Sequence, residues 1–275
     1  MAPTLNIIGA GKVGSVLGRL FSASGAFTVQ DVLTRSSASA ADGVAFMGAG
    51  RAVLALAQMA PADVWMLAVA DDQIVTVCEQ LASIRRLDGA VVFHCSGASS
   101  SSALQAAASV GAATASVHPV RSFADPAQVA GDFAATFCGV EGMAAALALL
   151  GAALNTIGAR VVPIDAAAKT VYHAASVFAS NYLVTVMDAA LRAYRAAGID
   201  EPTARAMAGP LATETLANVL RMGPEKALTG PIARGDMASV ARQQDALHHW
   251  DAAAGDLYRA LAAATVSLAR RREVD

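Results

Sequence analysis

Three glycines close to the start of the chain, Gly9, Gly11 and Gly14, have the spacing G-x-G-x-x-G. In dinucleotide-binding units the first glycine allows a tight turn, the second lets the backbone approach a pyrophosphate, and the third lets helix and strand touch. An apolar run at residues 5–8 precedes the motif and an amphipathic segment follows it, as a strand, turn and helix start require. The N–H groups at such a helix start attract phosphate. The motif therefore predicts a bound dinucleotide, contacted by Gly9, Ala10, Gly11, Lys12, Val13 and Gly14.

The tip of the second predicted strand, residues 27–33, bears on the choice between NAD and NADP. A carboxylate at this tip binds the ribose 2′-hydroxyl of NAD, whereas an arginine accommodates the 2′-phosphate of NADP. The tip holds Arg35 among hydroxyl residues, while the competing carboxylate, Asp31, lies in the middle of the strand. NADP is therefore favoured over NAD. The candidate cofactor residues outside the glycine motif are Thr34, Arg35, Ser36 and Ser37, with Val69 and Ala70 at the end of another strand.

A second group of polar residues has helical spacing. Lys169, His173, Ser176 and Ser180 are separated by 4, 3 and 4 positions, so they share one face of a helix predicted over residues 165–197. Buried polar groups need partners, because each unpaired one costs roughly 1–3 kcal/mol. This face is therefore expected to line a polar cleft. The alternative is that its side chains form internal hydrogen bonds that pack the helix against its neighbours.

Further candidates stand at the ends of strands. Ser96 and His118 follow two predicted strands, at residues 90–94 and 113–117, and ligands bind at the carboxyl ends of strands in such sheets. A histidine can act as a general acid or base near neutral pH, and a lysine can stabilise or protonate a carbonyl oxygen. The candidate catalytic residues are Lys169, His118, His173 and Ser96, and the candidate substrate-binding residues are Asn181, Ser176 and Arg234.

The order of predicted elements divides the chain in two. Apolar strands alternate with helices as far as Pro163, which indicates a mostly parallel, doubly wound sheet. After that residue only helical periodicity is found. The predicted fold is α/β, with an N-terminal doubly wound Rossmann domain at residues 1–164 and an all-α domain for substrate binding and dimerisation at residues 165–275. The predicted strands are residues 5–8, 27–33, 64–69, 90–94, 113–117, 133–140 and 160–164.

Composition limits the classes of function. The chain has 275 residues, of which 55% are hydrophobic and 15% charged, with a net charge of −2 and no basic block that would favour nucleic acid. The most apolar run, residues 143–154, is too short to span a bilayer, so no membrane association is expected. No signal peptide is recognisable and the three cysteines lack C-x-x-C spacing, which favours a cytoplasmic protein with reduced thiols. His248 and His249 are adjacent and point in different directions, so no metal site is predicted.

The few charges are also unevenly placed. Residues 170–187 contain no Asp, Glu, Lys or Arg. A solvated helix face carries several charges, so this helix is expected to be buried on most sides. The helical half then has more apolar surface than one subunit can cover. We expect a homodimer formed mainly through the residues beyond Asp165.

Five stretches carry a family resemblance: residues 9–15, 94–98, 118–119, 172–185 and 228–236. In them the chain resembles Rossmann-like NADP oxidoreductases of the 6-phosphogluconate dehydrogenase-like superfamily, in the branch with a C-terminal helical domain of unknown function. The resemblance implies an NADP-binding domain and an α-helical domain that often helps to form a dimer. The substrate of that branch is unassigned.

More distant relatives bear on the site. Dehydrogenases of the 3-hydroxyisobutyrate type and ketopantoate reductases place a lysine on the interdomain helix and an asparagine four positions later. Lys169 matches that lysine, whereas His173 stands where the asparagine would be. His118 and Pro119 are similar to the catalytic-histidine segment of prephenate dehydrogenases.

The predicted function is hydride transfer between NADP(H) and a small carbonyl, hydroxy or imine substrate in the interdomain cleft. The cofactor carries the hydride chemistry, so the protein must orient the substrate and move a proton. Three alternatives stay open: a non-catalytic dinucleotide sensor on the same fold, a reductase linked to a deazaflavin, and a reductase similar to prephenate dehydrogenase.

Overall fold

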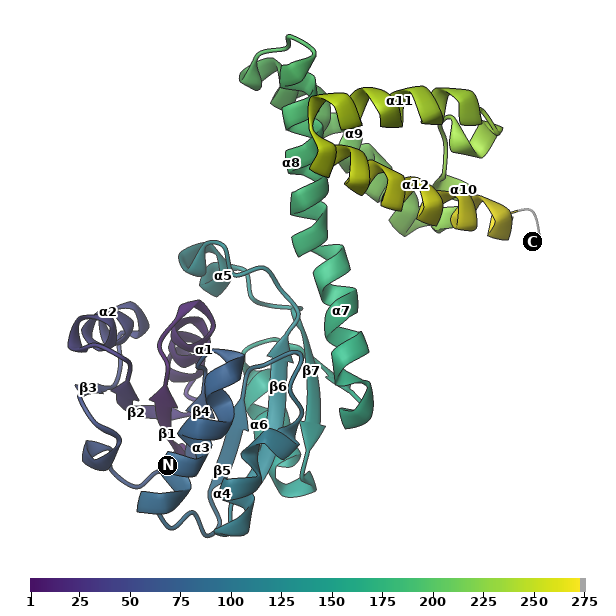
Figure 1. Cartoon of the computed structure of the whole chain (residues 1–275). Helices are drawn as coiled ribbons and strands as arrows, with labels where there is room; N and C mark the ends of the chain where they lie inside the picture. The colour runs from purple at the N-terminus through teal and green to yellow at the C-terminus, as the bar shows by residue number, and fades with distance from the viewer. Residues whose placement is uncertain (273–275) are drawn as a thin grey trace. The chain divides into compact units, whose positions relative to one another are not determined.

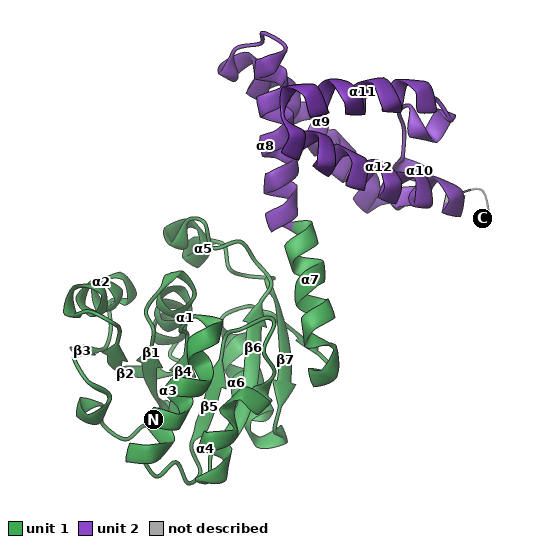
Figure 2. Ribbon diagram, in the orientation of Figure 1, with its two compact units in different colours: residues 1–179 green, residues 180–275 purple. Residues whose placement is uncertain are grey.

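In the computed structural model, which describes residues 1–272, the chain divides into two compact units, residues 1–179 and 180–275 (Figure 2). The first unit contains the sheet, and the regular elements described in the second, up to residue 272, are all helices. The sequence boundary at residue 164 falls earlier than this division. The helix after it belongs with the sheet, because Lys169 at its start is only 2% exposed and contacts residues at the strand ends.

One eight-stranded sheet organises the first unit, in the order β3-β2-β1-β4-β5-β6-β7-β8 (Figure 1). Neighbouring strands run parallel except β6 and β7, so the predicted mostly parallel, doubly wound sheet is confirmed. The three-residue edge strand β3 was missed because so short a segment carries no alternation. The strands are β1 Thr4–Ile8, β2 Thr28–Leu33, β3 Arg51–Val53, β4 Val64–Leu67, β5 Val91–His94, β6 Ala113–Pro119, β7 Phe137–Gly142 and β8 Arg160–Pro163.

Helices cover both faces of the sheet, so the central strands are apolar on both sides. Leu5 and Ile7 of β1 face one core, which is shared with α1 (Lys12–Ala23), α2 (Ser37–Met47), α5 (Pro126–Gly131) and α6 (Ala144–Thr156). Ile8 faces the other core, which is shared with α3 (Ile74–Ile84) and α4 (Gln105–Ser109). This two-sided burial holds the carboxyl ends of β1, β4, β5 and β6 in one row.

The turn between β1 and α1 depends on two glycines. Gly9 has a φ of +97°, a backbone conformation that residues other than glycine rarely adopt. A methyl group on Gly14 would lie 2.9 Å from Cβ of Ala68 and closer still to the carbonyl oxygen of Gly9. Helix and strand therefore touch here, as the glycine spacing predicts.

The helix predicted over residues 165–197 is found in pieces. A short 3₁₀ turn at Ala166–Ala168 is capped by Asp165, whose carboxylate accepts from the N–H of Ala167 at 2.9 Å. The α-helices α7 (Lys169–Ala179) and α8 (Asn181–Ala196) follow, separated by Ser180 with φ −130° and ψ −72°. The second unit continues with α9 (Glu201–Met222), α10 (Pro224–Ala227), α11 (Met237–Trp250) and α12 (Ala252–Arg272).

The expectation that this helix is buried on most sides is wrong for the single chain. Val171 is 76% exposed and Val184 is 71% exposed, whereas Lys169 is the buried residue of α7. By length and composition alone, the run Ala166–Ala196 is long and apolar enough to cross a membrane. The first turn of α7 contacts the sheet through Lys169 and Tyr172.

Candidate active site

A cavity of about 620 Å³ lies at the carboxyl ends of β1, β2 and β4. The glycine turn, the tip of β2 and the end of β4, which are far apart in the sequence, all line this cavity. The predicted cofactor residues that line it are Gly9, Ala10, Gly11, Thr34, Arg35, Val69 and Ala70. Its lining also includes residues that the sequence did not single out: Ser39, Leu54, Leu56, Gln73, Val77 and Gln80.

The other predicted cofactor residues, Lys12, Val13, Gly14, Ser36 and Ser37, are not among those that line this cavity. Lys12 donates from Nζ to the carbonyl oxygen of Ala124 at 3.0 Å, and Val13 packs on the core. Ser36 caps α2, because its hydroxyl oxygen accepts from the N–H of Ser39 at 3.2 Å, and Ser37 is the first residue of that helix. The start of α2 therefore lies beside Arg35, so helix N–H groups and a guanidinium can favour the same anion.

Asp31, the competing carboxylate, is already engaged. It is 1% exposed, pairs with Arg51 at 2.9 Å and accepts from the N–H of Ala60 at 2.7 Å. Within residues 1–272, by contrast, the guanidinium of Arg35 has no ion-pair partner. Its charge is therefore available at the cavity.

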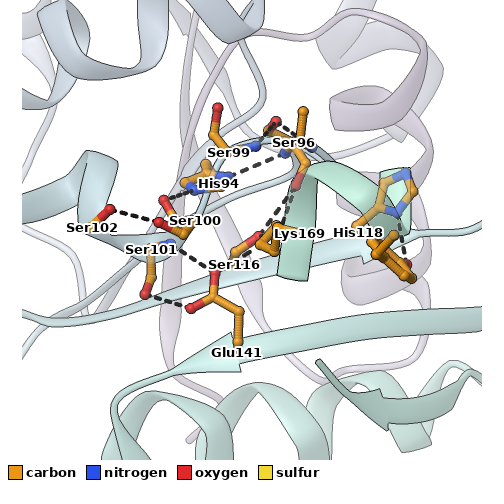
Figure 3. Close-up of polar contacts among 12 residues, drawn as sticks. His94, Ser96, Ser99, Ser100, Ser101, Ser102, Ser116, His118, Glu141 and Lys169 are labelled. Carbon is orange, nitrogen blue, oxygen red and sulfur yellow. Dashed lines mark hydrogen bonds and ion pairs between the residues drawn. The ribbon is translucent and has the colours of Figure 1, made fainter. Parts of the chain in front are cut away.

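Lys169 lies in a buried network and not at an open surface (Figure 3). Its Nζ donates to the carbonyl oxygen of Ser96 at 3.1 Å and to the hydroxyl of Ser116, and it lies 3.8 Å from Oε1 of Glu141. An ammonium group has three donor hydrogens, and three acceptors surround this one. Burial lowers the pKa of Lys169, and the negative charge of Glu141 opposes that shift.

Glu141 and His94 hold the loop that follows β5. The carboxylate of Glu141 accepts from the N–H and the hydroxyl of Ser101, both at 2.7 Å. Nδ1 of His94 accepts from the N–H of Ser96 at 3.2 Å, and Nε2 lies 3.0 Å from the carbonyl oxygen of Ser100. Burial lowers the pKa of His94, which favours the neutral ring these contacts need. The sequence signal for both residues, an ionisable side chain inside an apolar strand, was present but went unused.

The hydroxyl of Ser96 is also engaged in hydrogen bonds within the protein. Its hydroxyl donates to Oδ2 of Asp71 at 2.7 Å and accepts from the N–H groups of Ala98 and Ser99 at 3.2 and 3.0 Å. Asp71 begins the short 3₁₀ turn Asp71–Gln73 after β4 and makes no side-chain capping bond there. It instead ties the end of β4 to the loop after β5.

A half-buried part of the site is made by His118, Tyr172 and His173, named here the histidine–tyrosine group. The hydroxyl of Tyr172 is 2.9 Å from Nδ1 of His118, and the rings of His118 and His173 have centroids 5.5 Å apart. A methyl group on Gly97 would lie 2.7 Å from Nε2 of His118 and within 3.0 Å of the ring of His173. Glycine at position 97 therefore leaves room for both rings.

The electrostatics of His118 follow from this packing. Burial, with smaller contributions from the nearby His173 and Lys169, lowers the pKa of His118 to about 4. The ring is therefore neutral near pH 7, with one nitrogen that donates and one that accepts. A neutral imidazole can polarise an oxygen or nitrogen acceptor by a hydrogen bond.

Not every predicted site residue joins this group. Ser176 lies on α7, three positions beyond His173, whereas Asn181 and Arg234 belong to the second unit. Their assignment to a substrate stays a prediction. Among the described residues, no three or more His, Cys, Asp or Glu side chains are placed to hold a metal ion.

Two domain families match the chain. Residues 3–119 match a Rossmann-like domain, and residues 136–265 match a domain of unknown function, DUF2520. The second match begins just before β7 and ends within α12, so it contains the last two strands and the helices between them and that point. No curated protein matches this sequence.

Solved structures show a similar fold over nearly the full length of the chain. Protein TM1727 from Thermotoga maritima is 28% identical, covers 98% of this chain and 99% of its own, and has a TM-score of 0.71. BF3122 from Bacteroides fragilis, provisionally described as an NADP oxidoreductase, is 21% identical over 97% of this chain and 98% of its own, with a TM-score of 0.82. A reductive aminase from Aspergillus terreus, in complex with NADPH and ethyl-5-oxohexanoate, is 16% identical over 98% of this chain and 93% of its own, with a TM-score of 0.66.

Proposed function

Because this chain combines a Rossmann-like domain with a DUF2520 domain, we propose that it is an NADP-dependent oxidoreductase. Its substrate is a small carbonyl, hydroxy or imine compound. The observation that carries the proposal is the row of strand ends, with a glycine-turn cavity and Arg35 at β1 and β2 and the neutral His118 at β6. The reductive aminase of the same fold, whose structure contains NADPH, supports this class of reaction.

The residues of the cavity fit NADP. Apart from the neighbours of Gly11 in the chain, no atom of the described residues lies within 4 Å of the position that a methyl group on Gly11 would take, so a pyrophosphate can approach that backbone. The N–H groups at the start of α1 would hold the pyrophosphate. Arg35, Ser36 and Ser37 would hold the 2′-phosphate, together with Ser39, which also lines the cavity. NADPH, when bound, supplies the hydride.

The histidine–tyrosine group would handle the charge that hydride addition leaves on an oxygen or nitrogen atom. Such an atom needs a hydrogen-bond donor or a proton. His118 and His173 are the residues best placed to provide them. Lys169 donates to two protein acceptors and forms an ion pair with Glu141, so we assign it to positioning of the Ser96 loop and of α7.

Titration calorimetry with NADPH and NADH, followed by NADPH oxidation over a panel of aldehydes, ketones, 2-oxo acids and cyclic imines, tests this function. We expect tighter binding of NADPH than of NADH and oxidation with members of one chemical class. Tight binding without oxidation of any compound would support the sensor alternative. Oxidation only when a deazaflavin is added would support the deazaflavin-linked alternative.

Arg35→Ala is expected to weaken NADPH binding by roughly 10- to 100-fold and to leave NADH affinity nearly unchanged. The reason is the loss of a charge-assisted contact to the 2′-phosphate, worth about 1.5–3 kcal/mol. Arg86→Ala is the matched control, because this arginine is 91% exposed and lies outside the cavity. If Arg35→Ala lowered the affinities for NADPH and NADH equally, or if the wild type bound both equally well, Arg35 would not select NADP.

We also propose a homodimer formed mainly through the helices beyond Asp165. Leu211 is 60% and Leu220 is 79% exposed on α9, and Val184 is 71% exposed on α8. Light scattering at micromolar concentration is expected to give twice the chain mass of 27.8 kDa. The pair Val184→Asp and Leu220→Glu should give monomers, whereas Val75→Asp, at an exposed position of α3, should not. A monomeric wild type, or one recovered only with membranes, would contradict the proposal.

A further inference from the structure

Tyr172 makes a contact that the proposed reaction does not yet use. Its hydroxyl lies 2.9 Å from Nδ1 of His118, with the two rings at 87° to each other. We propose that Tyr172 is a positioning residue that donates to Nδ1 of His118 and thereby holds the tautomer whose Nε2–H faces the space beside Gly97. The catalytic consequence of this tautomer rests on the proposed function, but the tautomer itself does not.

The direction of the hydrogen bond follows from proton counting. A phenol has one proton to donate, and burial raises the pKa of Tyr172, so the hydroxyl stays protonated near pH 7. The neutral ring of His118 leaves one nitrogen bare, and among the described residues Nδ1 is the acceptor found for this hydroxyl. The reverse arrangement would leave the phenol proton without that acceptor, which disfavours it by about tenfold or more.

Two glycines make this arrangement possible. In the antiparallel pairing of β6 and β7, His118 lies opposite Gly139. A methyl group on Gly139 would lie 2.8 Å from Cζ of Tyr172 and closer still to its hydroxyl, so the phenol reaches His118 over a position without a side chain. On the other edge of the imidazole, Nε2 packs beside Gly97, where a methyl group would lie 2.7 Å from Nε2 and closer still to the ring of His173.

A phenol in this role has a chemical consequence. Catalytic histidines are often oriented by a carboxylate, which also stabilises the charged imidazolium. Here the nearby carboxylate, Asp71, is bound by the hydroxyl of Ser96, and the orienting group is neutral. The site therefore favours a neutral His118 that donates from Nε2 to an acceptor atom, such as a carbonyl oxygen or an imine nitrogen. This matches substrates that are reduced at a C=O or C=N bond.

The tautomer can be measured directly. Long-range ¹H–¹⁵N spectra at pH 7.5 of protein labelled with ¹⁵N-histidine show which ring nitrogen carries the proton, and a His118→Asn sample assigns the signals among the five histidines. In the wild type we expect a protonated Nε2 and a bare Nδ1 at His118. A protonated Nδ1 would overturn the proposal, whatever the variants do.

Tyr172→Phe, which removes one oxygen atom, is expected to shift the His118 tautomer ratio by about tenfold toward Nδ1–H. Tyr258→Phe is the control, because that hydroxyl donates to Gln243 in the second unit at 2.7 Å. Gly139→Ala should reproduce the change by displacing the phenol while Tyr172 is retained. An unchanged ratio in Tyr172→Phe would show that the phenol does not select the tautomer.

A kinetic measurement separates this inference from the proposed function. Once a compound that the protein reduces has been identified, Tyr172→Phe should lower kcat for its reduction by about tenfold and leave the Kd for NADPH unchanged. A protein that binds no NADPH and oxidises none would refute the proposed function, while the spectra would still decide the tautomer. Spectra that show a bare Nδ1 together with an unchanged kcat in Tyr172→Phe would refute the catalytic consequence alone.

Discussion

His118→Ala should lower kcat for NADPH oxidation by about 100-fold or more, the scale of losing a positioned acid–base or hydrogen-bonding group. Its Nε2 faces the space beside Gly97, and the ring lies outside the cavity lining that is assigned to the cofactor. The Kd for NADPH is therefore expected to stay within a few-fold of the wild-type value. Stopped-flow absorbance and calorimetry on the same samples check both expectations.

The control for this variant is His249→Ala, because that ring contacts the carbonyl oxygen of Asp245 in the second unit. The pH profile adds a second check. The folded pKa of His118, about 4, lies below the ordinary value of 6.5, so the ring is already neutral well below pH 7. Protonation of His118 should therefore cause no loss of rate between pH 5.5 and 8. An acid limb near pH 6.5 that disappears in His118→Ala would contradict the neutral-donor role.

The lowered pKa of His118 also makes the stability of the fold depend on pH. Since unfolding releases His118 to its ordinary pKa of 6.5, the unfolded chain binds this proton at a higher pH than the folded chain does. The stability contributed by the neutral ring is fully present above pH 6.5. It is lost as the pH falls from 6.5 through about 4.

Lys169→Met should lower the free energy of unfolding by about 3 kcal/mol, because removal of one partner from a buried ion pair leaves the other charge uncompensated. The partner is Glu141, which is 7% exposed and 3.8 Å away. Urea denaturation followed by tryptophan fluorescence measures the loss. Lys226→Met, at an exposed position of α10, is the control and should change the free energy of unfolding by less than 0.5 kcal/mol.

A double variant sharpens this test. Lys169→Met combined with Glu141→Gln should lose less stability than the sum of the two single variants, since contacting residues are coupled. Wild-type stability in Lys169→Met, together with a large loss of kcat, would instead restore the direct catalytic role that the sequence suggested for this lysine. Additive losses would show that the two charges do not interact.

What the sequence determined by itself is mostly local. The glycines of the first turn and the arginine at the tip of β2 belong to short local patterns, so their spacing was enough to predict the turn, the helix start and the class of cofactor. The alternation of strands and helices likewise predicted the doubly wound sheet. The fold class therefore needed no tertiary information.

The roles of the site residues were decided by contacts between distant parts of the chain. Lys169 is separated by 73 positions from Ser96 and by 53 from Ser116, so its spacing from His173 could place it on a helix face but could not show which groups surround it. Tyr172 precedes His173 by one position and was not selected, although its hydroxyl reaches His118. Helical periodicity assigns a face, whereas the partner across that face depends on how the strands are ordered in the sheet.

The exposure of α7 and α8 is a second feature that the sequence pattern could not predict. Absence of charge over residues 170–187 indicates a surface that avoids water, and in the single chain that surface is open. Composition indicates that an apolar helix face must be buried against another surface. It does not indicate whether that surface belongs to the same chain. The sequence by itself thus determined the dinucleotide turn and the sheet, because both arise from short-range patterns. Only the tertiary structure decided that Lys169 is held by Ser96, Ser116 and Glu141 and that His118 is held by Tyr172, because hydrogen bonds between remote segments exist only once the sheet has brought them together.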